Sequence, residues 1–183
     1  MSKPSSGHFG GTVGSLNAAK NIAQGSCSHV IIDKKNLDNR EHPTKYKQLG
    51  SKKLKVLREK VQDRTITKEE YKRLNWQNRL TARRNEAVKD FWEREKFLIQ
   101  NNLPSTRNWS AKQRLDILNG KKPKFNGKAM SSHHTYSVAR YPHLANRMDL
   151  IFPATYYEHI YGWHGGNTRK SLPGMPIKII SEF

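Results

Sequence analysis

This sequence has few of the features that mark membrane-spanning, disulfide-bonded or cysteine-ligated proteins. Its single cysteine, Cys27, excludes an internal disulfide framework and a cysteine-rich zinc module. No run approaches the roughly 18 consecutive apolar residues that a membrane-spanning helix needs. No apolar stretch follows the N-terminus, as it would in an ordinary secretory signal peptide. The 183 residues, of which 34% are hydrophobic, fit one domain with appendages or two small domains.

Acidic residues are also scarce. Asp and Glu number 15 against 34 Lys and Arg, which gives a net charge of +19. Residues 44–100 alone carry 17 cations and eight anions, so the anions of this region cannot pair all of its cations. The excess indicates a polyanionic partner. Nucleic acid is the commonest one, because each cation placed on a phosphate releases a counterion.

The histidines are distributed differently from the charge. Five of the eight lie between positions 133 and 164, in a segment (129–183) with only five cations and three anions. We therefore divide the chain into a Gly- and Ser-containing lead or linker (1–43), a basic helical region (44–122) and a histidine-rich region (123–183). The basic region is suited to binding and the histidine-rich region to chemistry.

Local signals predict that residues 44–122 are helical. Apolar residues at helical spacing follow Gly50 and predict a first helix. Thr67 and Glu70 fit a capping box, which should start a long helix that ends before Pro104. A further short helix is expected after Ser110.

The histidine-rich region is expected to fold in the order strand, loop, strand, helix. Lys128–His134 is the first predicted strand, and Leu150–Phe152 is the second. Thr155 and Glu158 fit another capping box, so a helix should begin near Tyr156. Histidines then lie on the first strand and on the helix.

A hydrolytic metal site needs this kind of arrangement. Neutral imidazoles bind a divalent ion, and phosphate oxygens complete its shell. A further imidazole, with an ordinary pKa of roughly 6.5, can deprotonate water near neutral pH. The adjacent pair His133 and His134 can divide these roles, because neighbouring side chains on a strand diverge.

An ordered set of motifs across residues 123–176 resembles the HNH/endonuclease VII nucleases, and within them the GHH type found at the C-termini of bacterial polymorphic toxins. The motifs are Pro-Lys-Phe-Asn-Gly, Ser-His-His, Tyr-Pro-His-Leu-Ala-Asn, Pro-Ala-Thr-x-x-Glu-His and Trp-His-Gly-Gly-Asn. Residues 44–122, with Arg-Asn-Trp-Ser before a short helix, are similar to the basic extension of such domains in Gram-positive secreted toxins of the LXG-like, type VII-secreted kind. The resemblance implies an α+β protein, in which a basic, mainly helical N-terminal region precedes a C-terminal ββα-metal (His-Me finger) nuclease motif at 123–183.

The resemblance also implies roles for the histidines. His133 would be a metal ligand and His134 the general base, while His159 would be a second ligand and His164 a third ligand or a phosphate contact. It implies one divalent ion rather than two, with Mg, Mn and Zn all left open. The product would carry a 5′-phosphate.

Two positions depart from the usual pattern. The asparagine in the middle of the motif, which has a catalytic bracing role, is either Asn146 or is replaced by Asp149. His159 and His164 are five residues apart, and five steps of a regular helix turn about 140°. The helix must therefore end near Gly162 or contain a π-bulge for both rings to reach one ion.

These features predict a metal-dependent endonuclease toxin that acts on DNA with little sequence readout. Phosphate contacts are assigned to Arg140, Arg147, Arg169 and Lys170, and His143 is interpreted as a loop-packing residue. An RNase on the same scaffold, or a non-enzymatic nucleic-acid-binding protein with a structural zinc, remains open. The expected partners are nucleic acid and a cognate acidic immunity protein, with no membrane partner. The chain is expected to be secreted as the C-terminal part of a larger toxin and to act in the target-cell cytoplasm.

Overall fold

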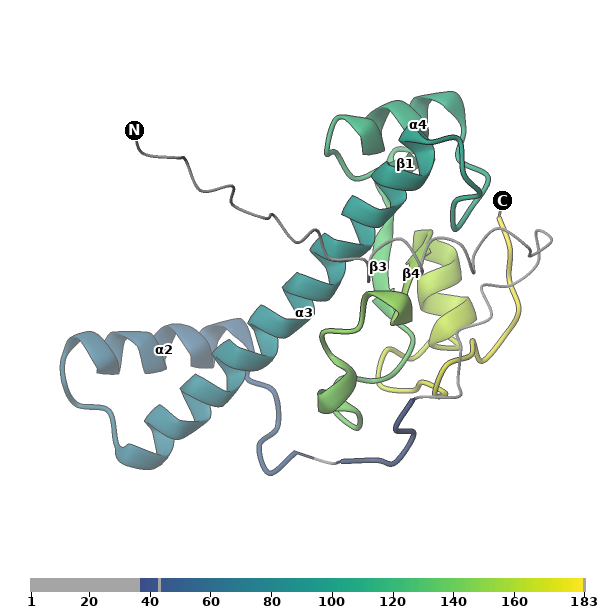
Figure 1. The fold of residues 1–183 in the computed structure, drawn as a ribbon. Coiled ribbons are helices and arrows are strands. Elements are labelled where there is room, and N and C mark those ends of the chain that lie inside the picture. The colour runs from purple at the N-terminus through teal and green to yellow at the C-terminus, as the bar shows by residue number, and fades with distance from the viewer. Residues whose placement is uncertain (1–36, 43, 183) are drawn as a thin grey trace, which may run out of the picture.

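The computed structural model describes residues 37–42 and 44–182 (Figure 1). The predicted lead, residues 1–43, lies outside the described part of the chain except for 37–42. Three α-helices come first, α2 (Ser51–Gln62), α3 (Lys68–Gln100) and α4 (Ala111–Leu118). A reciprocal capping box starts α3 at Thr67, as predicted, and the short helix expected after Ser110 is present as α4, which a second capping box starts.

Two short antiparallel strand pairs follow. β1 (Lys124–Phe125) pairs with β2 (Lys128–Ala129), and β3 (Ser131–His134) pairs with β4 (Ile151–Ala154). The predicted strand Lys128–His134 is thus divided at Met130, whose side chain is buried. The loop between β3 and β4 contains two 3-10 turns, η2 (Pro142–Leu144) and η3 (Met148–Leu150).

The chain leaves β4 through the third predicted capping box. The Glu158 amide donates to the Thr155 hydroxyl at 3.1 Å, and the Thr155 amide donates to the Glu158 carboxylate at 2.9 Å. After one α-helical step at Tyr156 and Tyr157, the helix widens into a π-helix, η4 (Glu158–Trp163). The bulge expected near Gly162 is therefore present.

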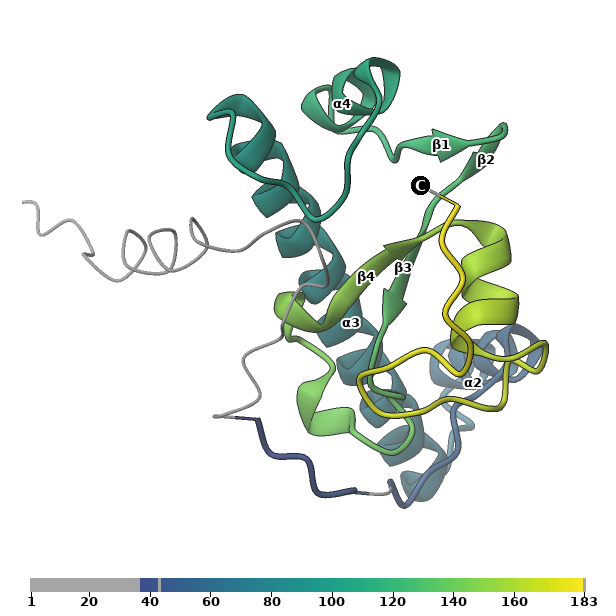
Figure 2. The same ribbon diagram turned by 90° about the vertical axis from the view of Figure 1, so that its right-hand side faces the viewer.

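The β3–β4 pair lies between α3 and the helix that contains η4 (Figures 1 and 2). On the α3 side, Ala87 and Phe91 pack against Ile151 of β4. Towards the C-terminal end of α3, one cluster joins residues of helices and strands, and its buried members are Ile99, Trp109, Ile117 and Met130. Helices of the basic region therefore pack directly against the strand region, which confirms an α+β architecture.

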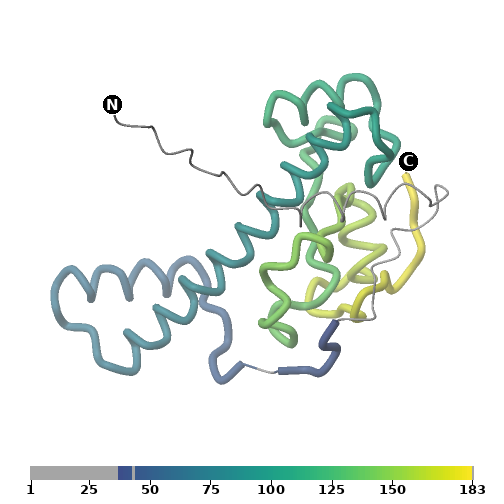
Figure 3. The backbone as a smooth tube through the Cα atoms, viewed as in Figure 1, coloured from purple at the N-terminus to yellow at the C-terminus, as the bar shows by residue number. Residues whose placement is uncertain are grey.

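The N-terminal half of α3 and the shorter α2 form a helical hairpin that projects away from the strands (Figure 3). Leu49, Leu57 and Leu74 hold this hairpin together. In the described part of the chain, no helix has the length and apolarity needed to span a membrane.

Candidate metal centre and general base

Three histidines from two elements converge on one face of the β3–β4 pair. His133 comes from β3, His159 from η4, and His164 from the residue just after η4. Their ring centroids are 5.0, 5.1 and 4.9 Å apart. One possible ligand atom of each lies within 4.8 Å of the others. The structure thus brings together all three residues predicted to bind the ion.

The π-helix explains how residues five apart in sequence reach the same point. The His164 amide donates to the His159 carbonyl at 3.2 Å, which is the five-residue hydrogen bond of a π-turn. A regular α-helix would leave the two rings about 140° apart. Gly162 is buried in this turn, and a Cβ atom there would meet the Lys178 carbonyl at 3.3 Å.

A backbone carbonyl orients His164. Its Nδ1 lies 2.6 Å from the Lys170 carbonyl oxygen, so Nδ1 carries the proton and Nε2 keeps a lone pair. Hydrogen bonding of the second ring nitrogen to a carbonyl is the usual support for a metal-binding histidine. His133 is oriented by packing instead, because its ring lies 4.6 Å from that of Trp163.

The site keeps the imidazoles of His133 and His159 neutral. Burial, followed by the nearby His159 and His164, lowers the pKa of His133 to about 3. Burial and then His164 also lower the pKa of His159. Metal ligation requires the neutral ring, so the three residues fit a divalent ion. Three protein ligands leave an open position, as in catalytic rather than closed structural sites, and all-imidazole sets suit zinc and related ions better than magnesium.

His134 follows His133 on the strand and makes different contacts. Its Nε2 lies 3.2 Å from the Ala145 carbonyl, so this nitrogen is the donor and Nδ1 holds the lone pair. Burial, and then the positive charge of Arg84, lowers the pKa of His134 to about 4. The ring is therefore neutral near pH 7 and can accept a proton.

The loop that supplies the Ala145 carbonyl is attached to α3. Arg83 of α3 donates from Nη2 to the Asn146 side-chain oxygen and to the His143 carbonyl, both at 2.8 Å. The other candidate brace, Asp149, is paired with Arg147 at 2.8 and 2.6 Å. These contacts favour Asn146 as the residue that braces the loop beside His134.

The four predicted phosphate contacts lie in two different settings. Arg147 is engaged by Asp149, and Arg140 lies 3.5 Å from the Glu41 carboxylate. Arg169 and Lys170 are exposed on the loop that follows His164. Of the four predicted phosphate contacts, Arg169 and Lys170 are therefore the two that directly follow the three-histidine cluster in sequence.

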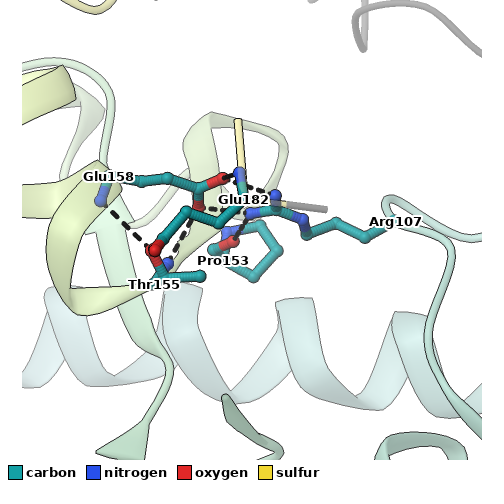
Figure 4. A network of polar contacts seen from close by, with 5 residues as sticks. All are labelled: Arg107, Pro153, Thr155, Glu158 and Glu182. Carbon is teal, nitrogen blue, oxygen red and sulfur yellow. Dashed lines mark hydrogen bonds and ion pairs between the residues drawn. The ribbon is translucent and has the colours of Figure 1, made fainter. Parts of the chain in front are cut away.

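Sequence reasoning missed the ion pair that anchors the helix with the candidate ligand His159 (Figure 4). Arg107, in the segment between α3 and α4, binds both carboxylate oxygens of Glu158 at 2.6 Å and donates to the Pro153 carbonyl at 2.7 Å. The Glu182 amide donates to the same carboxylate at 3.1 Å. The capping box pointed to Glu158, but no local spacing pointed to Arg107.

A second group with metal-ligand chemistry, Asp38, His42 and His143, lies beside the loop. Both carboxylate oxygens of Asp38 already bind Arg40, at 2.8 and 2.9 Å. The Nε2 atom of His143 lies 2.9 Å from the Asp38 carbonyl, and its ring packs against that of His42. These contacts agree with the loop-packing interpretation of His143.

Comparison with known proteins gives a family match for part of the chain. The family model for a GHH signature containing HNH/Endo VII superfamily nuclease toxin matches residues 74–154. The matched segment runs from α3 to the end of β4 and includes His133, His134 and Asn146, whereas His159 and His164 lie beyond it. No curated protein and no solved structure shows a significant match to the chain.

Proposed function

Residues 74–154 belong to the GHH-signature nuclease toxins of the HNH/Endo VII superfamily, and from that premise we propose that this chain is a metal-dependent endonuclease that hydrolyses phosphodiester bonds in DNA with little sequence specificity. One observation carries the proposal. Three imidazoles converge on one point, and the residue after His133 on the same strand, His134, is held separately by a carbonyl. This arrangement provides both an open metal site and a general base.

The three-histidine cluster would hold the ion through His133, His159 and Nε2 of His164. When bound, a divalent ion supplies a positive charge that polarises the phosphate and stabilises the leaving oxygen. The Nδ1 lone pair of His134 takes a proton from water, and the oxygen of that water attacks phosphorus in line with the leaving 3′ oxygen. The Nε2–H group of His134 donates a hydrogen bond to the Ala145 carbonyl. This hydrogen bond fixes the tautomer and favours the imidazolium that forms.

The charge of the chain supports nucleic acid as the substrate. Backbone contacts from Lys and Arg give affinity without sequence information. A helical platform of 17 cations and eight anions over residues 44–100 is suited to that mode of binding. The loop cations Arg169 and Lys170 would contact phosphates near the metal site.

Two further elements of the proposal concern the biology of the toxin. An active nuclease of this charge endangers the cell that makes it, so we expect a cognate immunity protein with an acidic binding surface. Delivery would require secretion as the C-terminal part of a larger toxin, of the LXG-like, type VII-secreted kind, followed by action in the target-cell cytoplasm.

The direct test is to incubate the purified chain with plasmid DNA and, separately, with RNA, each with divalent metal and with EDTA. We expect conversion of supercoiled plasmid to nicked and linear forms with metal, and none with EDTA. Cleavage of RNA but not of plasmid would favour the RNase alternative. Binding of metal and DNA without cleavage of either substrate would favour a structural zinc site and contradict the proposal.

A further inference from the structure

A polar pocket lies between α3 and β3, next to the proposed general base. It has a volume of about 180 Å³ and is lined by Thr81, Arg84, Asn85, Val88, Ser132 and His134. The four residues from α3 are spaced at i, i+3, i+4 and i+7, so they share one face of that helix. The two residues from β3 flank His133, the buried residue of the metal centre.

The groups around this pocket are rich in hydrogen-bond donors. The guanidinium of Arg84 has five N–H groups and no acceptor, and the Asn85 amide adds two more. No carboxylate is among the lining residues, all of which belong to the described part of the chain. A pocket with surplus donors and a fixed cation is complementary to an anion.

Arg84 differs from its neighbour Arg83 in what it contacts. Arg83 binds the His143 carbonyl and Asn146, as described above. The Arg84 guanidinium has no hydrogen bond or ion pair with any residue in the ranges 37–42 and 44–182. Its surroundings desolvate it enough to lower its pKa, although the residue remains exposed to solvent. The Arg84 guanidinium is thus accessible from solvent, lines the pocket and has no counter-charge among the lining residues, so it is available to an anion that enters the pocket.

The position of β3 lets one substrate meet both this pocket and the metal centre. β3 pairs only with β4 among the described strands, so its other edge has no strand partner there. His133 and His134 project to opposite sides of that strand. A polynucleotide that follows β3 can therefore contact the two sides at once.

From this placement, and on the basis of the proposed function, we infer that the α3–β3 pocket binds a substrate phosphodiester and that Arg84 is the cation that holds it. Two guanidinium N–H groups donate to the non-bridging oxygens of the phosphate beside His134. Arg84 thereby positions the phosphate for attack by the water that His134 deprotonates, and stabilises the charge that develops on it.

The first test compares Arg84→Ala with Arg79→Ala. Arg79 is an exposed residue of the same helix and does not line the pocket, so both changes remove one positive charge from α3. At saturating DNA and metal, we expect Arg84→Ala to lower the cleavage rate by about 10²-fold or more, the loss typical of one positioned donor. Arg79→Ala removes a platform cation and can lower DNA affinity, but at saturating DNA a loss of affinity alone leaves the rate within a few fold of the wild type. Arg84→Lys should restore only part of the rate, because lysine cannot make the two-pronged contact.

The second test measures anion binding in the pocket and does not depend on cleavage. The Trp92 indole N–H donates to the Ser132 hydroxyl at 2.9 Å, so its NMR resonance reports on the pocket. Titration of the metal-free protein with inorganic phosphate should shift this resonance to saturation in the wild type and in Arg79→Ala, but not in Arg84→Ala. Equal titration of all three proteins, together with equal cleavage by the two variants, would overturn the inference and leave the proposed function intact. A wild type that titrates phosphate but cleaves nothing would instead refute the proposed function and leave the anion pocket standing.

Discussion

Arg107 and Glu158 lie 51 residues apart in the chain and form a two-pronged ion pair, with Nη1–Oε2 and Nη2–Oε1 both at 2.6 Å. Their side chains are only 7% and 2% exposed. The burial of Glu158 would raise its pKa, but hydrogen bonds from Arg107 and the Thr155 amide outweigh that effect and hold the pKa below its usual range. Glu158 directly precedes His159, so the pair joins the α3–α4 connection to the helix that contains the proposed metal ligand His159.

Arg107→Ala should therefore destabilise the whole protein. The change leaves a buried carboxylate without its partner, which typically costs about 3–5 kcal/mol. Arg58→Ala is a suitable control, because Arg58 is exposed on α2 and its loss should cost less than about 0.5 kcal/mol. Urea unfolding of the three proteins gives the comparison. Equal midpoints for the two variants would show that the ion pair does not stabilise the fold.

The π-turn predicts unequal roles for the two helix-associated ligands. Both His159→Ala and His164→Ala should weaken metal binding by more than the roughly 10–100-fold that changes in outer-shell partners cause. His159→Ala should be the worse of the two, because His159 lies inside η4, whereas His164 follows its last residue. Calorimetric titration with zinc measures both affinities, with His143→Ala as the control. If His164→Ala binds zinc like the wild type, His164 is a substrate or packing residue.

The lowered histidine pKa values predict how the stability of the metal-free protein depends on pH. His133 and His134 have pKa values of about 3 and 4 in the folded chain, against roughly 6.5 when unfolded. The unfolded state therefore binds more protons below pH 6.5, and the free energy of unfolding must fall as the pH is lowered. Each histidine contributes a slope of up to about 1.4 kcal/mol per pH unit.

Urea unfolding of the metal-free protein between pH 7 and pH 5 measures this slope. The carboxylates of Asp149 and Glu158, whose pKa values are also lowered, add their losses at lower pH, below their unfolded values. His133→Asn should flatten the curve over the histidine window. A wild-type stability that stays constant from pH 7 to pH 5 would show that these rings are not held neutral.

DNA binding should weaken steeply with salt. The affinity of a protein with several phosphate contacts falls by orders of magnitude between about 50 and 200 mM salt. Replacing both Arg169 and Lys170 with glutamine should reduce the slope of log affinity against log salt by about 1.8 if each contacts one phosphate. The Lys170 carbonyl that supports His164 is unaffected by a side-chain change. Lys124→Gln, a change of an exposed residue on β1 outside the basic helical region, serves as the control. A flat salt response of the wild type would contradict the proposal that residues 44–100 bind the phosphate backbone.

The parts of the fold that the sequence predicted well are the local ones. Capping boxes involve residues three apart, so Thr67 and Thr155 correctly marked where two helices begin, and the short helix expected after Ser110 is also present. Angular arithmetic on His159 and His164, together with the glycine between them, left a helix end or a π-bulge as the two alternatives, and the structure has the π-bulge.

The contacts that could not be predicted join residues far apart in the chain. Arg107 with Glu158, Arg83 with Asn146 and Trp92 with Ser132 depend on how α3 packs against the strands, which no local pattern specifies. The same packing changes the interpretation of the basic region. Residues 44–100 include Phe91, which is fully buried against β4, so a deletion of that region would remove core as well as charge. Point substitutions of exposed cations are therefore the appropriate test of binding.

The measurement that tests the central claim most directly is the plasmid cleavage rate of His134→Ala beside that of the wild type, at saturating metal. His134 lies outside the three-histidine cluster, so the variant should keep its zinc affinity and DNA affinity. Loss of a general base should lower the rate by about 10²–10⁴-fold. A variant that cleaves within a few fold of the wild type, with metal binding unchanged, would contradict hydrolysis by this pair of adjacent histidines.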